Sequence, residues 1–212
     1  MSDESSAREE ILALMQAKER RPIHVQHVTK LALQFFDGLA SLHGLGPRER
    51  LLLEAAGHLH DIGHQADPAG GHHRESARMI RSHDWKNFSP SEVEVIAQVA
   101  RYHRKGMPEM DHEEFRALPM GDRRVVQFLA ALLRLADALD RSHVQIVDRV
   151  AIELPNNKIM IHLDVSGPIL REVNSAHTKG DLAMAIFQRD LVFMVDGEEI
   201  KPLLPGQFPP PS

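Results

Sequence analysis

Residues 50–64 read RLLLEAAGHLHDIGH, and this stretch determines how the rest of the chain must be arranged. Pro47 suits the first turn of a helix, and the apolar residues after it surround the helix on nearly all sides. The stretch therefore predicts a central, buried helix. An adjacent His60-Asp61 pair follows near its end, before Gly63. Strongly polar groups in apolar surroundings are costly to desolvate unless a hydrogen bond or a metal satisfies them, so we expect partners for this pair elsewhere in the chain.

A second His-Asp pair serves as an internal control. His83-Asp84 lies in RSHDWKNFSP, residues 81–90, among polar and turn-forming residues. Both side chains can be solvated there, so this pair needs no partners. With 14 histidines in 212 residues, a His-Asp pair alone indicates little, and its neighbours decide the interpretation.

The first two thirds of the chain are predicted to be helical, because apolar residues recur at three- and four-residue steps. Ser89, Pro90 and Glu92 give one helix a capping box with proline in its first turn. Residues 107–121 are expected to form a loop. The expected helices span residues 6–20, 23–43, 47 to about 60, 73–83, 89–103 and 122–142.

Beyond residue 143 the hydrophobic period changes to two. VAIEL (150–154) and IMIHLDV (159–165) alternate on either side of a turn, which predicts a hairpin. A helix over 169–189, interrupted at Gly180, and a strand over 191–195 follow. The expected fold class is mainly α, with a helical bundle over residues 1–143, a small α+β (ββαβ) module over 144–200, and a proline-rich, extended or disordered tail over 201–212.

Composition and charge exclude several classes of protein. The formal net charge of -5 argues against a nucleic-acid surface as the main function. The acidic start, MSDESSAREE, is not a secretory signal, and no apolar run approaches the roughly 18 residues of a spanning helix. We therefore expect a cytoplasmic protein without membrane or nucleic-acid partners. Because the chain has no cysteine, a metal would have to be held by imidazole and carboxylate groups.

Three other helices offer polar side chains that can point inward toward the central His-Asp pair. His24 and His27 lie one turn apart on the second helix, and one of the two can face the core. His103 continues the apolar stripe of the fifth helix. Asp137 lies on the buried face of the most apolar helix, in LAALLRLADALD, residues 129–140. Imidazoles and carboxylates that meet inside a helical bundle suit a divalent metal centre better than a core.

The order and spacing of these motifs resemble those of the HD-domain metal-dependent phosphohydrolases, whose pattern is a His, a later His-Asp pair and a distant Asp on the last long helix. More closely, the chain resembles the C-terminal HD region of the exopolyphosphatase/guanosine pentaphosphate phosphatase (Ppx/GppA) family over residues 20 to about 195. The stretches that carry this resemblance are HVTKLALQFFDGLASLHGLGPRERLLLEAAGHLHDIG (27–63), GHHRESARMI (71–80), VARYHR (99–104) and LLRLADALDRSH (132–143).

This resemblance implies a metal site, in which His60 and Asp61 would be the central catalytic residues and Asp61 would bridge two ions. One or two ions of Mn, Fe, Zn, Co or Ni are admissible with such ligands. Because bound metal activates water, no Ser or Cys nucleophile is required. The implied metal ligands are His27, His60, Asp61, His73, His103 and Asp137. The cations expected to bind substrate phosphates are Arg74, Arg104, Lys105 and Arg141.

The implied function is a stand-alone metal-dependent phosphohydrolase that cleaves a phosphate ester or anhydride of a small molecule, such as a nucleotide, a guanosine polyphosphate or polyphosphate. The family usually carries an actin-like phosphatase half in front of this region, so the chain is expected to act alone or with a partner. The alternative is a non-catalytic polyphosphate- or nucleotide-binding or regulatory module that acts with a separate partner. The resemblance also makes a homodimer an option.

Several polar residues also have an ordinary structural interpretation. His24 is expected to be a surface or hydrogen-bonded histidine, and His72 to face solvent. Asp140 is expected to be a charge at a helix end, and Asp137 has the alternative of a surface ion pair with a neighbouring arginine. His64 stands where related two-metal domains often have Lys, which leaves its phosphate-facing role open.

Overall fold

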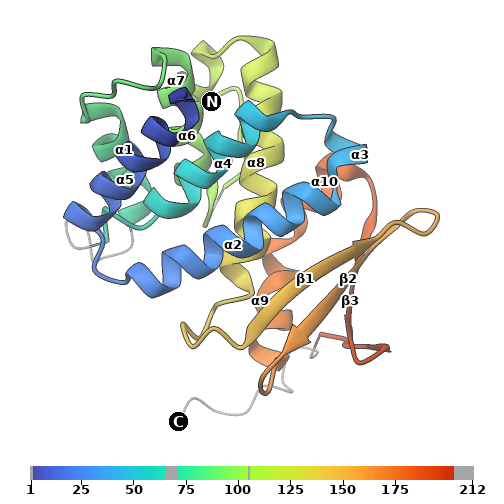
Figure 1. The fold of residues 1–212 in the computed structure, drawn as a ribbon. Helices are drawn as coiled ribbons and strands as arrows, with labels where there is room; N and C mark the ends of the chain where they lie inside the picture. Colours follow the sequence, from blue (N-terminus) through green and yellow to red (C-terminus); the bar gives the residue numbers. More distant parts are fainter. Residues whose placement is uncertain (1, 65–70, 105, 203–212) are drawn as a thin grey trace.

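A bundle of helices forms most of the molecule, and a small sheet follows it in the chain (Figure 1). This computed structural model describes residues 2–64, 71–104 and 106–202. The mainly helical fold class is confirmed. Within the described ranges, none of the helices is long and apolar enough to cross a membrane. The bundle comprises α1 Ser2–Lys18, α2 Pro22–Gly38, α3 Ala40–His43, α4 Pro47–Leu59, α5 His72–Ser82, α6 Pro90–Tyr102, α7 Glu113–Ala117 and α8 Met120–Ala138.

Helix α4 is the centre of the bundle, and it packs against α1, α2, α6 and α8. Its Leu51, Leu53 and Leu59 are fully buried, and each such side chain contributes about 1.5–3 kcal/mol relative to an exposed one. Gly57 allows a close approach to α2, because a Cβ atom there would lie 2.6 Å from Thr29 Oγ1. The predicted central helix is therefore present, and α2 crosses close beside its last turn.

Several helix boundaries differ from those predicted, including the start of α1 at Ser2 and the end of α8 at Ala138. The expected helix over 23–43 ends at Gly38, and the short α3 follows. A side chain at Gly38 would collide with Ile152, so this end of α2 lies against the sheet. The expected loop over 107–121 contains α7, and α8 begins at Met120 rather than Asp122, directly after Pro119.

The carboxy-terminal sheet has the strand order β1-β2-β3-β4. Strands β1 and β2 form the predicted antiparallel hairpin, β2 and β3 are parallel, and β4 is a short antiparallel edge strand that was not predicted. A parallel pair needs a crossover connection, which α9 and α10 supply. The elements are β1 Val147–Glu153, β2 Lys158–Val165, α9 Leu170–Lys179, α10 Asp181–Phe187, β3 Asp190–Val195 and β4 Glu198–Glu199.

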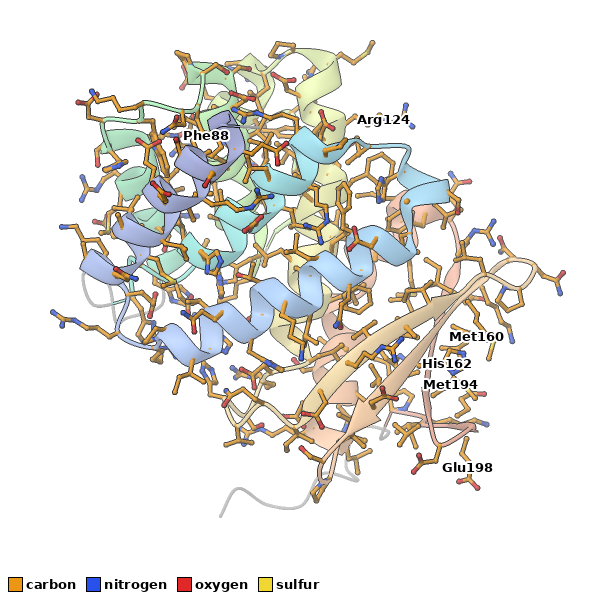
Figure 2. The ribbon with its side chains drawn as sticks, in the orientation of Figure 1. Phe88, Arg124, Met160, His162, Met194 and Glu198 are labelled. Carbon is orange, nitrogen blue, oxygen red and sulfur yellow. The ribbon has the colours of Figure 1, made fainter. Side chains whose placement is uncertain are left out.

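The sheet and its crossover helices pack directly on the bundle. Helices α9 and α10 contact α8, and β1 contacts α2. Met160, His162 and Met194 lie on the side of the sheet away from the helices (Figure 2). One hydrophobic cluster includes core residues of both the bundle and the sheet. A domain boundary at residue 143 stays a prediction, and the predicted tail lies mostly outside the described residues.

Candidate metal centre

The His60-Asp61 pair lies in the turn that ends α4, and both residues are buried. Gly63 fixes the position of this turn against α5. Its N–H donates a hydrogen bond to Ser76 Oγ at 2.9 Å, and a Cβ atom at Gly63 would lie only 2.4 Å from the Ser76 backbone nitrogen. The glycine two residues after Asp61 therefore lets the turn lie directly on the first turns of α5.

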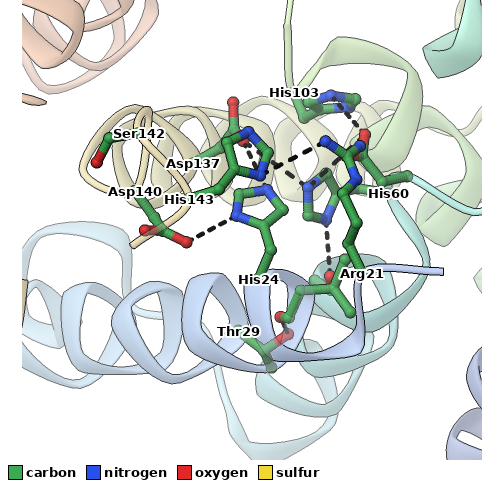
Figure 3. A network of polar contacts seen from close by, with 12 residues as sticks. Arg21, His24, Thr29, His60, His103, Asp137, Asp140, Ser142 and His143 are labelled. Carbon is green, nitrogen blue, oxygen red and sulfur yellow. Dashed lines mark hydrogen bonds and ion pairs between the residues drawn. The ribbon is translucent and has the colours of Figure 1, made fainter. Parts of the chain in front are cut away.

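The buried histidines His24 and His103 lie near His60 and Asp137 (Figure 3). Among the described residues, two overlapping groups of side chains could hold a metal ion. The first is His24, His60 and Asp137, and the second is His60, Asp61 and His103. Within each group the ligand atoms all lie within 4.8 Å of one another. The structure thus brings together four residues that the sequence singled out, and it adds His24.

In His60 and His103, one ring nitrogen is bound to the backbone and the other points into the site. His60 Nδ1–H donates to the Gly57 carbonyl at 2.7 Å, and His103 Nδ1–H donates to the Ala100 carbonyl at 2.6 Å. A carbonyl can only accept, so in each neutral ring Nε2 carries the lone pair. His60 Nε2 is buried without a hydrogen-bond partner. Metal-binding histidines usually have this arrangement.

His24 is oriented in a similar way, with a carboxylate in place of the carbonyl. Its Nδ1–H donates to Asp140 Oδ2 at 2.7 Å, and its buried Nε2 forms an ion pair with Asp137 Oδ1 at 3.5 Å. Asp140 is fully buried and also accepts the Gln145 N–H at 2.8 Å. The expectation that Asp140 is a helix-end charge is therefore wrong, because the turn after α8 folds back over its carboxylate. His143 and Gln145 have positive φ in that turn.

Each of the two central carboxylates has one oxygen facing the histidines. Asp61 Oδ1 lies 3.7 Å from His103 Nε2 and 3.9 Å from His60 Nε2, and Asp137 Oδ1 lies 3.8 Å from His60 Nε2.

The other oxygen of each carboxylate accepts from a cation. Asp61 Oδ2 accepts from Arg21 Nη2 at 2.6 Å, and Asp137 Oδ2 accepts from Lys179 Nζ. Lys179 belongs to α9, so the module after the bundle supplies a side chain to the site. Arg21 and Lys179 thereby fix which oxygen of each carboxylate points inward.

These neighbours shift the pKa values of the acidic groups. Burial would raise the pKa of Asp137, but the Lys179 ammonium and the ion pair with His24 hold it well below its usual range. Burial would also raise the pKa of Asp61, but His60 and His103 together with the Arg21 guanidinium lower it. Both carboxylates are therefore ionised at neutral pH and able to bind a cation.

The pKa values of the histidines move in opposite directions. Burial would lower the pKa of His24, but the neighbouring Asp137 and Asp140 carboxylates raise it to about 9. Burial lowers the pKa of His103 to about 3 and that of His72 to about 4. Without metal, His24 is therefore protonated at neutral pH, and the His103 and His72 rings are neutral.

Two histidines differ from expectation in their position. His24, rather than His27, faces His60 and Asp137. His24 is buried and His27 only partly so, and His27 lies on the neighbouring side of α2. The spacing alone does not decide between them, because His24 lies four residues before the buried Val28 and His27 lies four residues before the buried Leu31. The geometry therefore replaces His27 by His24 in the candidate ligand set.

The adjacent pair on α5 differs in a similar way. His72 was expected to face solvent, but it is buried, and its Nε2 lies 3.4 Å from Asp61 Oδ1. His73 is partly buried and its ring centroid lies 6.5 Å from that of His103. His73 is therefore near the site, but His72 is the member of the pair that faces Asp61. His64 is exposed beside His72.

The expected phosphate-binding cations are found in several positions. Arg104 lies at the site, with Nη1 3.2 Å from His72 Nδ1. Arg74 is exposed beside a cleft described below, and Arg141 is exposed on the turn after α8. Lys105 lies outside the described residues. Sequence reasoning missed Arg21 and Lys179, since their contacts with Asp61 and Asp137 span 40 and 42 residues along the chain.

A cleft of about 340 Å³ opens beside His73, on the α5 and α6 side of the site. It has the size of a small-molecule site. Polar side chains and two glycines predominate in its lining. The described residues that line it are Gly71, His73, Arg74, Arg101, Tyr102, Gly106 and His112.

Comparison with known families gives one match over most of the chain. The family described as Ppx/GppA phosphatase, domain III, matches residues 12–182. The matched range includes both candidate metal groups and Lys179. The comparison with curated proteins gives no match.

Proposed function

The chain belongs to the Ppx/GppA phosphatase family through its domain III, and from this premise we propose that it is a metal-dependent phosphohydrolase of the HD type. Its substrate would be a small molecule with a phosphate ester or anhydride, such as a nucleotide, a guanosine polyphosphate or polyphosphate. The proposed ligands for the ion are His24, His60, Asp61 and Asp137, with His103 beside them.

One observation carries this proposal. His24 Nε2 and His60 Nε2 both face Asp137 Oδ1, at 3.5 and 3.8 Å, and His60 Nε2 is buried without a hydrogen-bond partner. A buried polar atom without a partner is costly, and native structures rarely keep one without a reason. A divalent cation would satisfy both nitrogens and Asp137 Oδ1 together, and nitrogen and oxygen ligands of this kind suit Mn, Fe, Co, Ni and Zn.

The surrounding residues support this assignment by fixing the orientation of the ligands. Asp140 holds the His24 ring by its Nδ1–H, and the Gly57 carbonyl holds His60 in the same way. Lys179 leaves Asp137 only one oxygen to offer to the interior. Ligands held in this way lose little freedom when an ion binds, which favours tight binding.

The proposed chemistry needs no nucleophilic side chain. A divalent ion bound here would lower the pKa of a bound water and stabilise negative charge on phosphoryl oxygens. Arg104 and the cleft residues Arg74 and Arg101 provide positive charge on one side of the site, where a substrate phosphate would be attracted. We propose that these arginines bind the substrate phosphate.

The proposal is tested by metal content and turnover together. Wild type, Asp61→Ala and Asp137→Ala, with Asp84→Ala as the matched surface control, are loaded with Mn²⁺, Fe²⁺ or Zn²⁺ and dialysed. Elemental analysis and phosphate release from a panel of nucleotides, guanosine polyphosphates and short polyphosphate are then measured.

We expect metal and turnover in wild type and Asp84→Ala, and neither in the other two variants, whose helical content should persist. Wild-type protein without bound metal would refute the metal centre. Bound metal without turnover on any substrate would instead favour a non-catalytic binding module.

A further inference from the structure

Two arginines beside the candidate metal centre each bind a residue that a second metal ion would need. Arg21 binds Asp61, and Arg104 binds His72. We infer that these two arginines restrict the centre to a single divalent ion. This inference rests on the proposed metal centre, and it replaces the two-ion arrangement, bridged by Asp61, that the sequence resemblance allows.

The first constraint lies on Asp61. A carboxylate bridges two cations by offering one oxygen to each, as in two-metal phosphatases. Asp61 Oδ1 faces the histidines, but Oδ2 accepts a hydrogen bond from Arg21 Nη2 at 2.6 Å. A guanidinium cannot be deprotonated in a protein, so its positive charge is permanent. A second ion at Oδ2 would have to displace this charge.

Arg21 is held in place from two sides. The buried Glu19 carboxylate accepts the backbone N–H groups of Arg20 and Arg21 at 2.8 and 2.7 Å. At the other end of the side chain, Arg21 Nη1 lies 3.5 Å from His143 Nδ1. Displacing the guanidinium from Asp61 would therefore also disturb its contact with His143.

The second constraint lies on His72, whose Nε2 faces Asp61 Oδ1 at 3.4 Å. Arg104 has only hydrogen-bond donors, so His72 Nδ1, 3.2 Å from Arg104 Nη1, must be the acceptor. In that neutral tautomer Nε2 carries the hydrogen and has no lone pair for a metal. If the hydrogen moved to Nδ1, the His72 Nδ1–H and the Arg104 Nη1–H groups would both be donors and would face each other.

The three residues of the first group, His24, His60 and Asp137, have no such constraint. The atoms His24 Nε2 and His60 Nε2 and Asp137 Oδ1 are not bound by any arginine among the described residues. His60 has one available nitrogen, because its Nδ1–H is donated to Gly57. An ion in the first group therefore takes His60 away from the second group.

The test counts ions per chain. Wild type, the double variant Arg21→Gln/Arg104→Gln and the charge-matched surface control Arg20→Gln/Arg171→Gln are stripped with chelator and dialysed against Mn²⁺. Arg20 and Arg171 are both exposed. Manganese is measured by elemental analysis, and electron paramagnetic resonance detects any spin-coupled Mn²⁺ pair. Arg21→Lys, which keeps the charge, is measured in the same way.

We expect one Mn²⁺ per chain in wild type, in the surface control and in Arg21→Lys. The double variant should bind close to two, with a spin-coupled signal. Two ions in wild type would overturn the inference and leave the proposed function intact. A folded double variant with one ion would show that the arginines do not determine the number of bound ions per chain. Wild type without any ion would overturn both proposals.

Discussion

His60-Asp61 and His83-Asp84 are the same dipeptide in surroundings of opposite polarity. The Asp61 side chain is 7% exposed and lies between Arg21 and the histidines. The Asp84 side chain is 85% exposed and pairs with Lys86, two residues away. The first pair ends a helix in the centre of the bundle, and the second follows the end of α5 at the surface.

The difference shows that the side chains packed around a two-residue motif decide whether it can form a functional site. A solvated carboxylate needs no partner, whereas a buried one must be paired, hydrogen-bonded or bound to metal. The surroundings of His60-Asp61 supply two cations and several imidazoles from other helices.

The largest effect is expected from removing the histidine of each pair. His60→Ala should weaken Mn²⁺ or Zn²⁺ binding by more than about 100-fold, because the loss of an outer-shell partner alone costs 10- to 100-fold. His83→Ala should leave the affinity unchanged, because its side chain is partly exposed at the surface. Titration against a chromophoric chelator measures both.

Far-UV circular dichroism tells a lost ligand from a lost fold, and His60→Gln, which keeps more of the side-chain volume, serves as a second variant. An equal loss of affinity in the His60 and His83 variants would remove the distinction between the two pairs.

The pH dependence of stability sharpens the comparison, because the buried cluster contains a histidine with a raised pKa. In metal-free protein the pKa of His24 is about 9, against 6.5 when unfolded. The contribution of protonated His24 to the free energy of unfolding is therefore complete below pH 6.5. It is lost as pH rises from 6.5 through 9, and amounts to on the order of 3 kcal/mol. Urea unfolding between pH 6 and 9.5 should show this decline in wild type. A decline of the same size in His24→Gln would exclude His24 as its source.

Much of the fold could be predicted because its signals are local. The capping box of Ser89 and Glu92 is present as expected, with the Ser89 N–H donating to Glu92 Oε2 at 2.8 Å. His103 and Asp137 lie on apolar stripes that the helix period reveals, and both reach the site. Where one helix face is apolar, a polar residue on that face is likewise directed inward.

The remaining features depend on contacts between distant parts of the chain. His24 and His27 differ by three residues, about 60° around a helix, and only packing decides which of them faces Asp137. Lys179 follows the hairpin and belongs to a segment that was predicted as a separate module. Its contact with Asp137 exists because α9 packs on α8. No local sequence pattern predicts that packing.

The smallest effect on stability is expected at the position two residues after the aspartate of each pair. Gly63 follows Asp61, whereas Lys86 follows Asp84. Gly63→Ala would place a Cβ atom 2.4 Å from the Ser76 backbone nitrogen and 2.6 Å from the His72 carbonyl, so the turn must move. Overpacking of this kind costs typically 1–3 kcal/mol.

Gly121→Ala is the matched control, because a Cβ atom there meets nothing within 4 Å and Gly121 lies in the first turn of α8. Alanine favours a helix over glycine by up to about 1 kcal/mol, so this variant should be as stable as wild type or more so. Urea unfolding measures both substitutions. If Gly63→Ala were as stable as Gly121→Ala and bound metal normally, the turn that carries His60-Asp61 would not depend on its close contact with α5.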